Sequence, residues 1–294
     1  MDIAVIGAGK WGSALHFAFS RNFTCKITSR HKRDMDDFVS LEEALKFEYL
    51  VFAIPAQVVG DWLTKNFIFR NQKVLVVAKG IEKNSGSFLN QIFSKHIPNE
   101  NLAFLSGPSF AKEVMESLPT AVVINSKNEK LAKHFSKYFP DFIKTYISDD
   151  VIGAEICGAY KNVLAIASGI CTGLDLGNNA RASLMARGLV EMHRFGEIFG
   201  AKEETFLGLS GAGDLFLSAS SELSRNFRVG LALAKEIALD EILKDLGEVA
   251  EGVFTTEAVL KLSKQYDIYT PIAEEVSKIL NGKNPKESLK DLLR

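Results

Sequence analysis

The sequence predicts an α/β protein, with a doubly wound parallel sheet in its first half and an all-α domain in its second half. Three observations favour this fold class. The length of 294 residues is about twice the roughly 150 residues expected of one domain. Up to about residue 150, strand-length apolar runs alternate with helical segments, and beyond it long segments have helical spacing. We therefore expect domains at 1–150 and 151–294.

The predicted strands are short runs rich in β-branched and aromatic residues. A continuous apolar run such as Leu50–Ile54 suits a strand buried on both faces of a parallel sheet. Amphipathic or polar segments between the runs predict the connecting helices. The expected strands are Ile3–Ile6, Cys25–Ser29, Tyr49–Ile54, Val74–Ala78, Leu102–Leu105 and Thr120–Ile124, and the expected helices are Trp11–Arg21, Leu41–Lys46 and Ser85–Phe93.

The second half is predicted to be helical, with glycines between several of its helices. The charged segment Lys283–Arg294 is expected to form a solvated last helix. The other expected helices are Val151–Thr172, Ala180–Phe199, Asp214–Ser221, Val229–Ala238, Thr255–Gln265 and Pro271–Leu280.

The composition argues against several classes of protein. With 35 Lys and Arg against 36 Asp and Glu, no nucleic-acid-binding surface is expected over the whole chain. The cysteines Cys25, Cys157 and Cys171 have no CxxC spacing, and the histidines have no metal-ligand spacing, so neither a disulfide framework nor a metal site is expected. No apolar run approaches the roughly 18 residues of a membrane span. The N-terminus resembles a strand more than a signal peptide. We expect a soluble cytoplasmic protein.

A glycine-rich turn follows the first predicted strand. Gly7, Gly9 and Gly12 form a GxGxxG pattern that opens the first helix. Such glycines allow a tight turn, a close backbone approach to a pyrophosphate and close helix–strand packing. The helix N-terminus adds N–H groups for phosphates. A tight turn without a ligand is the alternative, but in this context the pattern predicts a Rossmann-type dinucleotide-binding domain.

The end of the second predicted strand bears on the choice between NAD and NADP. An acidic residue there would bind the ribose hydroxyl of NAD, whereas this strand runs into Arg30-His31-Lys32-Arg33. A guanidinium suits the 2′-phosphate of NADP. The alternative is a solvated basic loop. We expect NADPH to be preferred over NADH.

Two strand ends in the first half carry further polar candidates. Lys79 follows the predicted strand Val74–Ala78, at the end that faces the ligand crevice of an open α/β sheet, although strand-end lysines are also common in solvent. Ser109 lies in another strand–helix turn, where it could cap the helix Ala111–Met115 or contact a small polar ligand.

Lys161 lies in a predicted helix with little charge in its interior. At helical spacing it shares a stripe with Ala154, Gly158, Ala165 and Ser168. Small neighbours leave room for a ligand or for a close helix crossing. Partial desolvation would favour the neutral amine, as acid–base catalysis needs. The alternative is a lysine that extends from the helix edge into solvent.

A second glycine turn precedes Asp214, which could cap a helix or pair with a catalytic lysine. The triplet Ser224-Arg225-Asn226 follows. Arg225 is suited to bidentate phosphate contact, while a polar loop between helices is the commoner explanation.

These motifs in this order resemble the NAD(P)-dependent glycerol-3-phosphate dehydrogenases of bacteria. The resemblance extends from residue 3 to about residue 260. Besides the glycine turn, the matching segments are Ala78–Glu82, Ser106–Val114, Gly158–Val163, Gly211–Leu215, Leu223–Asn226 and Ala250–Val253.

The resemblance implies a helical C-terminal domain similar to that of 6-phosphogluconate dehydrogenase. It also implies reversible reduction of dihydroxyacetone phosphate to sn-glycerol 3-phosphate, a phospholipid precursor, by a homodimer. Lys161 would be the general acid/base, oriented by Asp214. The implied substrate contacts are Lys79, Gly107, Ser109, Lys161, Asp214, Ser224, Arg225 and Asn226, and the implied cofactor contacts are Gly7, Gly9, Lys10, Trp11, Gly12, Arg30, Lys79, Ala111, Arg225 and Glu251.

Two other functions remain open from the sequence. One is a dehydrogenase of the same architecture that acts on a hydroxy acid or sugar acid, which the phosphate-binding triplet disfavours. The other is a nucleotide sensor without turnover, which needs no catalytic lysine. The sequence also departs from the family pattern, because only Arg30–Ser40 separates the second predicted strand from Leu41. This short segment makes the strength of the NADPH preference uncertain.

Overall fold

The structure, a computed structural model, describes residues 2–35, 37–247 and 249–292. The chain forms two compact units. The first comprises the residues up to Lys79 together with Leu89–Ala154, and the second comprises Gly80–Phe88 together with the residues from Glu155 onward. This division differs from a single cut after residue 150 in two ways, because Gly80–Phe88 belongs to the helical unit and the first unit continues to Ala154.

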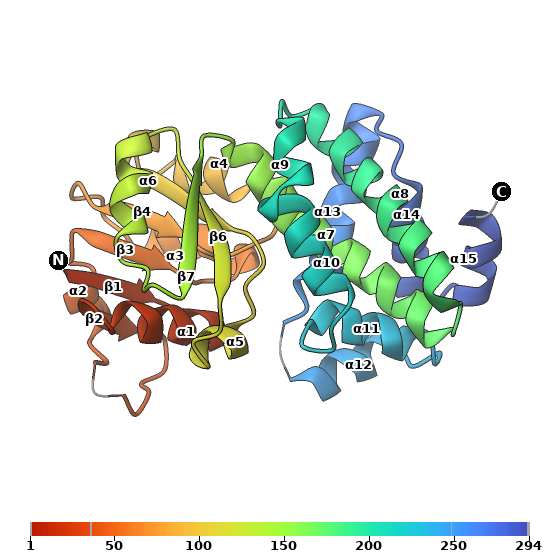
Figure 1. Ribbon diagram of the computed structural model, residues 1–294, viewed down its shortest axis with the longest axis horizontal. Coiled ribbons are helices and arrows are strands. Elements are labelled where there is room, and N and C mark those ends of the chain that lie inside the picture. Colours follow the sequence, from red (N-terminus) through yellow and green to blue (C-terminus); the bar gives the residue numbers. More distant parts are fainter. Residues whose placement is uncertain (1, 36, 248, 293–294) are drawn as a thin grey trace. The chain divides into compact units, whose positions relative to one another are not determined.

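The first unit is built on a seven-stranded sheet of order β2-β1-β3-β4-β5-β6-β7 (Figure 1). Strands β1 to β5 pair in parallel, which confirms the predicted doubly wound sheet. The order reverses at β1, whose neighbours are β2 and β3. The strands are β1 (Asp2–Ile6), β2 (Thr24–Thr28), β3 (Tyr49–Phe52), β4 (Lys73–Val76), β5 (Leu102–Ser106), β6 (Thr120–Asn125) and β7 (Ile143–Ser148).

The predicted parallel sheet has one antiparallel pairing, because β6 runs antiparallel to β5. The connecting helix α5 (Ala111–Met115) has 5 residues and is therefore about 7.5 Å long. Strand β7, which pairs in parallel with β6, was not predicted because its residues are mixed polar and apolar and half of them are exposed.

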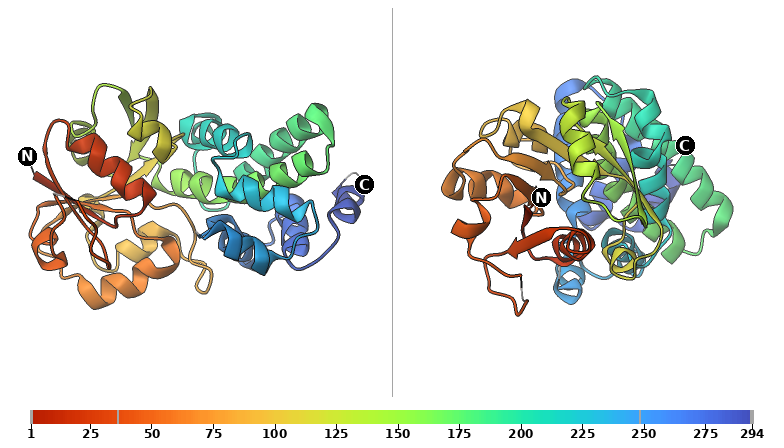
Figure 2. Two further views of the ribbon diagram at one scale, coloured as in Figure 1. Left: turned by 90° about the horizontal axis from the view of Figure 1, so that it is seen from below. Right: turned by 60° about the vertical axis from the view of Figure 1, so that its left-hand side comes forward.

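Alternate strand residues pack on opposite faces of this sheet. Ile3 and Val5 of β1 belong to one core cluster and Ala4 and Ile6 to another, as the period-two geometry of a strand requires. Figure 2 (left) shows helices on both sides of the strands. The first cluster includes residues of α1 (Lys10–Phe19), α5 and α6 (Glu129–Ser136), and the second includes residues of α2 (Leu41–Ala44), α3 (Ala56–Asn66) and α4 (Leu89–Phe93).

The predicted helix Ser85–Phe93 is shorter in the structure, where α4 begins at Leu89. The preceding residues form a turn in which the Gly86 N–H bonds to the Glu82 carbonyl and Gly86 has a φ of 72°. That left-handed conformation does not continue a helix. Helices α3 and α6 and the short 3-10 turn Asn99–Asn101 were not predicted.

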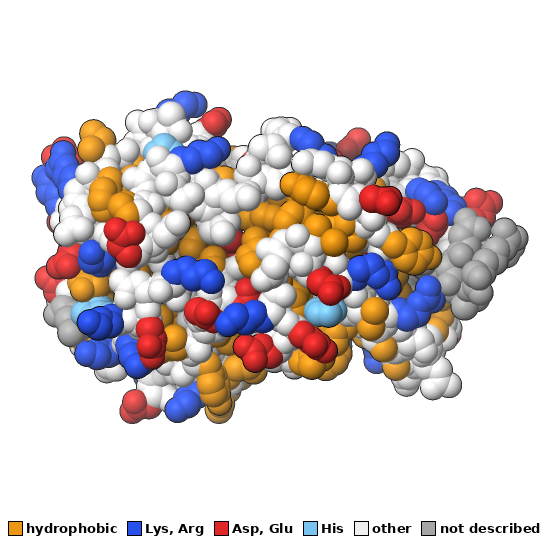
Figure 3. All heavy atoms as spheres, turned by 90° about the horizontal axis from the view of Figure 1, so that it is seen from above, with side chains coloured by type: hydrophobic (Ala, Val, Ile, Leu, Met, Phe, Trp, Pro, Cys, Tyr) orange, Lys and Arg blue, Asp and Glu red, His pale blue; other side chains and the backbone are white. Residues whose placement is uncertain are grey.

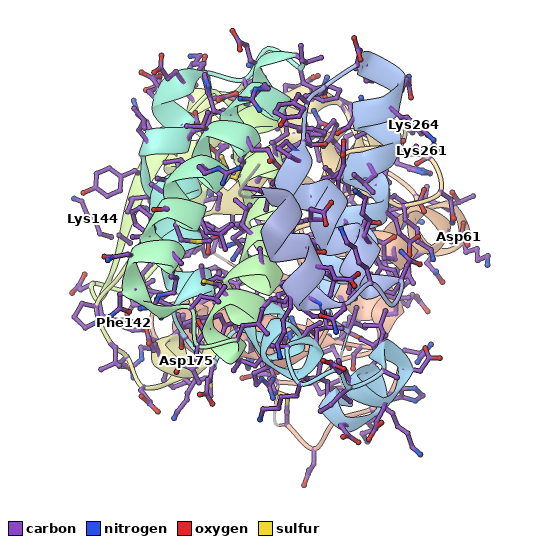
Figure 4. The ribbon with its side chains drawn as sticks, turned by 90° about the vertical axis from the view of Figure 1, so that its right-hand side faces the viewer. Asp61, Phe142, Lys144, Asp175, Lys261 and Lys264 are labelled. Atoms are coloured by element: carbon purple, nitrogen blue, oxygen red, sulfur yellow. The ribbon has the colours of Figure 1, made fainter. Side chains whose placement is uncertain are left out.

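The second unit is helical, as expected (Figure 4). Asp175 lies in the connection between its two longest helices, and the exposed Lys261 lies on α13. Helices α9 and α12 and the π turn were not predicted. The elements are α7 (Val151–Gly173), α8 (Gly177–Glu197), α9 (Glu203–Leu207), a π turn (Leu209–Gly213), α10 (Asp214–Ala219), α11 (Arg225–Leu233), α12 (Leu239–Leu246), α13 (Glu251–Tyr266), α14 (Pro271–Leu280) and α15 (Pro285–Leu292).

The segment Gly80–Phe88 packs on α13 within the second unit. Lys83 pairs with Glu257 at 3.6 Å and its ammonium lies over the Phe254 ring. The Lys261 ammonium donates to the Asn84 carbonyl. These contacts attach the chain that follows Lys79 to the helical unit.

Helix α7 is long and apolar enough to cross a membrane by length and composition alone, although Glu155 and Lys161 interrupt its apolar residues. However, 94% of its most apolar window is buried, which is how a helix in a protein core behaves. On the face drawn in Figure 3, the described basic and acidic side chains are interspersed and do not form a field of one sign.

Candidate active site

The glycine turn at the carboxyl end of β1 has the geometry that dinucleotide binding needs. Gly7 has a φ of 117°, and a Cβ there would lie 2.6 Å from the Ala53 carbonyl oxygen. A Cβ at Gly12 would lie 1.8 Å from the Gly7 carbonyl oxygen. Larger residues at these two positions would separate α1 from β1 and β3, so these glycines hold the turn tight.

The same turn leaves space where a pyrophosphate would be bound. A Cβ built on Gly9 meets none of the described atoms within 4 Å. Gly9 is also the N-cap of α1 and has no side chain to occupy the first N–H groups of that helix. Open space in front of the first N–H groups of a helix fits a dinucleotide phosphate. Lys10 begins α1 and is exposed, and Trp11 is half-buried against the core.

Arg30 follows β2 and is exposed. Its Nε lies 3.1 Å from the ring nitrogen Nε2 of His31, and the Ser29 hydroxyl donates to the His31 carbonyl at 2.7 Å. The short segment after β2 is not a free loop, because Ile27 and Phe38 form a parallel bridge. Lys26 and Asp37 add an ion pair at 2.8 Å.

Three predicted residues of the first unit lie together at the ends of β4 and β5. The Lys79 ammonium donates to the Gly107 carbonyl at 3.1 Å, and the Ser109 hydroxyl donates to the same oxygen at 3.3 Å. Ser109 does not cap α5, whose N-cap is Phe110. Ala111 is the first residue of α5 and is half-buried. The structure therefore shows that Ser109 is not the N-cap of α5.

In the second unit, Lys161 is buried against two polar side chains of α10. Its ammonium donates to Oδ1 of Asp214 at 2.7 Å and to the Ser218 hydroxyl at 2.7 Å. The side chains of Lys161 and Asp214 are 10% and 2% exposed. Burial rules out the solvated lysine, and it leaves an oriented ammonium inside a polar cluster.

Local structure explains why the Asp214 carboxylate is available to the lysine. Asp214 is the first residue of α10 and Gly213 is the N-cap, so the carboxylate does not cap the helix. A negative charge in the first helical turn is favourable. Helix α10 is also fixed on α7 by the Ser168 hydroxyl, which donates to the Ala219 carbonyl at 2.6 Å.

The predicted phosphate-binding triplet forms the start of α11, which begins at Arg225, not at the predicted Val229. Ser224 is the N-cap, and its hydroxyl oxygen accepts from the Phe227 N–H at 3.3 Å. Arg225 is exposed, whereas Asn226 is 8% exposed. The Asn226 Oδ1 accepts from the Gly252 N–H at 2.9 Å, next to Glu251, the half-buried first residue of α13.

Two contributors were not recognised in the sequence. Ser218 stands one helical turn after Asp214 and therefore lies on the same face of α10, so the spacing was a usable signal. The Gly252 N–H could not be recognised in the sequence, because every residue except proline has a backbone N–H and the residue type does not show which one makes a contact. Among the described residues, no group of three or more His, Cys, Asp or Glu side chains could hold a metal ion.

Comparison with known proteins identifies the family. The sequence model "NAD-dependent glycerol-3-phosphate dehydrogenase N-terminus" matches residues 35–132, and the corresponding C-terminus model matches residues 150–290. The chain is 63% identical over 294 residues to the glycerol-3-phosphate dehydrogenase [NAD(P)+] of Campylobacter jejuni subsp. doylei, covering 100% of this chain and 99% of the relative. It is 62% identical over 291 residues to the enzyme of that name from Sulfurimonas denitrificans, covering 99% and 98%.

A solved structure agrees with these matches. The glycerol-3-phosphate dehydrogenase of Coxiella burnetii superposes with a TM-score of 0.92 at 32% identity, covering 100% of this chain and 98% of that one. Sequence and fold therefore agree along the whole length of the chain. This protein belongs to the NAD-dependent glycerol-3-phosphate dehydrogenase family.

Proposed function

We propose that this protein reduces dihydroxyacetone phosphate to sn-glycerol 3-phosphate, reversibly, with NADPH or NADH, and so supplies glycerophospholipid synthesis. One observation carries the proposal, which is the buried Lys161–Asp214–Ser218 cluster in a chain of this family. An ammonium held by two oxygens is oriented, and it can donate a proton where negative charge develops on a substrate oxygen.

The cofactor would be held by the first unit through the turn Gly7–Gly12. The N–H groups at the start of α1 would bind the pyrophosphate, and the open space at Gly9 supports this assignment. Lys10, Trp11 and Ala111 remain proposed contacts, as do Lys79, Arg225 and Glu251. When bound, the nicotinamide supplies the hydride for the ketone carbon.

The NADPH preference remains a proposal that depends on Arg30. Its guanidinium is exposed and so can reach a 2′-phosphate in solvent. Arg30→Ala should lower kcat/KM with NADPH by about 10- to 100-fold and leave kcat/KM with NADH unchanged. Equal losses with both cofactors would remove Arg30 from this role.

Lys161 would act as the acid in reduction and as the base in oxidation. As the carbonyl oxygen gains charge, the Lys161 ammonium donates a proton to it, and the Asp214 carboxylate stabilises the ammonium beforehand. In the reverse direction the neutral amine accepts the proton of the hydroxyl. Arg225, with Ser224 and Asn226, would bind the substrate phosphate, so that remote binding energy orients the carbonyl. Gly107 and Ser109 stay proposed substrate contacts.

The direct test is oxidation of NADPH on addition of dihydroxyacetone phosphate, with unphosphorylated dihydroxyacetone and a 2-oxo acid as controls. Lys161→Ala should lower kcat by about 10²- to 10⁴-fold while NADPH binding, followed by fluorescence, is kept. Arg225→Ala should mainly raise KM for dihydroxyacetone phosphate. Intact NADPH binding without turnover in the wild type would favour a nucleotide sensor.

We also propose a cytoplasmic homodimer. Exposed apolar side chains of the helical unit, such as Val190 at 57% and Leu207 at 65%, support a subunit contact. Cys25, Cys157 and Cys171 are buried and form no disulfide with one another, which is compatible with a reducing compartment. Light scattering coupled to size-exclusion chromatography measures the oligomeric state, and a monomer at assay concentrations would contradict the dimer.

A further inference from the structure

The segment Gly80–Phe88, which we name the strap, directly follows Lys79 in the chain. The strap belongs to the helical unit, whereas Lys79 is the last residue of the first unit before it. Lys79 is half-buried, and its ammonium donates to the Gly107 carbonyl at 3.1 Å. The backbone of Lys79 is therefore held by β4 on its N-terminal side and by a segment of the other unit on its C-terminal side.

Hydrogen bonds within the strap make it a defined turn. The Glu82 carboxylate accepts from the N–H groups of Asn84 and Ser85 at 2.9 and 2.8 Å. Ile81 and Phe88 form an antiparallel bridge at the base of the strap, and their side chains are 0% and 1% exposed. Because these contacts leave the turn few free torsions, a shift at its tip is transmitted to its base.

The tip of the strap is held on α13 by two lysines. The Lys83 ammonium pairs with Glu257 at 3.6 Å and lies 5.1 Å from the centre of the Phe254 ring. The Lys261 ammonium donates to the Asn84 carbonyl. The side chains of Lys83 and Glu257 are 36% and 57% exposed, so this ion pair contributes little to stability. These contacts therefore define where the strap lies more than they stabilise the fold.

A single residue, Gly80, joins Lys79 to the base of the strap. Gly80 is buried and has a φ of 150°, which residues with a side chain rarely adopt. Consecutive Cα atoms are about 3.8 Å apart, so the Cα of Lys79 lies within about 7.6 Å of that of Ile81. Over so short a link, the direction in which Lys79 leaves the backbone depends on where the strap is held.

We propose that Lys83 and Lys261 are positioning residues, which fix the strap on α13 and thereby set the position of the Lys79 ammonium for the reaction. The proposal rests on the proposed function, in which Lys79 contacts the substrate and the cofactor. Misplacing such a contact by about 1 Å can cost about 100-fold in rate. Contacts that contribute little to stability can therefore still control turnover.

The combined variant Lys83→Met with Lys261→Met tests this role. Methionine has a similar length but no charge and no N–H donor. We expect kcat/KM for dihydroxyacetone phosphate to fall at least about tenfold, while the thermal unfolding midpoint stays within a few degrees of wild type, because surface ion pairs contribute little to stability. Lys83→Arg with Lys261→Arg keeps the cations and donors, so it should restore kcat/KM to within about twofold of wild type.

Repeating the Met substitutions in a Lys79→Met background separates positioning from general structural damage. If Lys83 and Lys261 act through Lys79, their loss should have no further effect on kcat/KM once that ammonium is absent, so the effects should not add. Lys264→Met is the matched control. Lys264 is an exposed lysine of the same helix (Figure 4), and the structure gives it no hydrogen bond or ion pair with a described residue. Its variant should keep wild-type kcat/KM.

The position of Lys79 is also measurable without turnover. Acetic anhydride in limiting amount acetylates accessible amines, and mass spectrometry of the peptide that contains Lys79 gives the rate at this residue. In the Lys83→Met, Lys261→Met protein, Lys79 should be acetylated at least about threefold faster than in the wild type, because local opening exposes the amine. Lys264→Met should leave this rate unchanged.

The outcomes distinguish this inference from the proposed function. If the wild type reduces dihydroxyacetone phosphate, three results overturn the positioning role and leave the function standing: an unchanged kcat/KM in the combined variant, an equal loss in Lys264→Met, or additive losses in the Lys79→Met background. If the wild type does not reduce this substrate, the proposed function fails, and acetylation decides the inference. Faster acetylation of Lys79 in the combined variant then supports the inference, and an equal rate overturns it in either case.

Discussion

Removing the Asp214 carboxylate should destabilise the protein strongly, because it leaves a charge buried without its counter-ion. In Asp214→Ala, the Lys161 ammonium would keep the Ser218 hydroxyl at 2.7 Å but would lose the carboxylate at 2.7 Å. Both charged side chains are at least nine-tenths buried. Breaking such a pair from one side costs about 3–5 kcal/mol, so the free energy of unfolding should fall by that amount.

The pair should also show strong coupling in a double-mutant cycle. Lys161→Met should be costly alone, since it leaves the Asp214 carboxylate buried, but Lys161→Met combined with Asp214→Leu removes both charges. The double variant should therefore be more stable than either single variant, with a coupling energy of about 2 kcal/mol or more. Ser218→Ala, which removes a neutral partner, is the control and should cost only about 1 kcal/mol.

Urea unfolding followed by circular dichroism measures these differences, with equal m-values required for the comparison. Additive losses in the double variant would refute the reasoning, because they would mean that the ammonium and the carboxylate are each satisfied by other groups. Asp214→Ala should also lower kcat in the dehydrogenase assay. A wild-type kcat with a lowered stability would assign Asp214 a structural role only.

Other parts of the chain give further expected outcomes. Gly12→Ala should abolish NADPH binding measured by fluorescence quenching, because its Cβ would meet a carbonyl oxygen at 1.8 Å, and retained affinity would contradict the tight turn. Burial would raise the pKa of Glu275, but hydrogen bonds from the Lys278 and Lys283 ammonium groups lower it from 4.5 to about 2. The stabilisation is therefore complete above pH 4.5 and is lost as the pH falls toward 2, by at most about 3 kcal/mol. Glu275→Gln should remove this pH dependence in urea unfolding, and an unchanged profile would contradict the assignment.

The fold was predictable where the sequence repeats a simple pattern. Strands β1, β3, β4 and β5 contain continuous buried apolar runs, and the long helix α7 has clear helical spacing. Strand β7 was missed because Lys144, Thr145 and Tyr146 alternate poorly in hydrophobicity on an edge strand. The helix predicted to begin at Ser85 begins at Leu89 instead, because Gly86 has a left-handed backbone conformation and forms a turn.

In the candidate site, likewise, some residues were predicted from the sequence and some contacts were not. Side chains in recognisable strings were predicted, and the structure brings Lys161 to Asp214 and Lys79 to Gly107. Backbone donors and orientations were not predictable, because the Gly252 N–H depends on how three helices pack. Tertiary packing decides such contacts, and a single sequence does not encode them as a local pattern.

The two polar clusters of the helical unit differ in net charge, and under the proposed function this difference would orient the substrate. At Lys161 the ammonium is neutralised by Asp214 at 2.7 Å, so a phosphate gains little there and would be repelled by the carboxylate. At the start of α11, Arg225 and the donors around Asn226 present positive potential. Under the proposed function, the phosphate is therefore attracted to α11, and the neutral carbonyl is left for the lysine. Under the proposed function, the Asp214 carboxylate would therefore both stabilise the ammonium and disfavour a phosphate at the position of proton transfer.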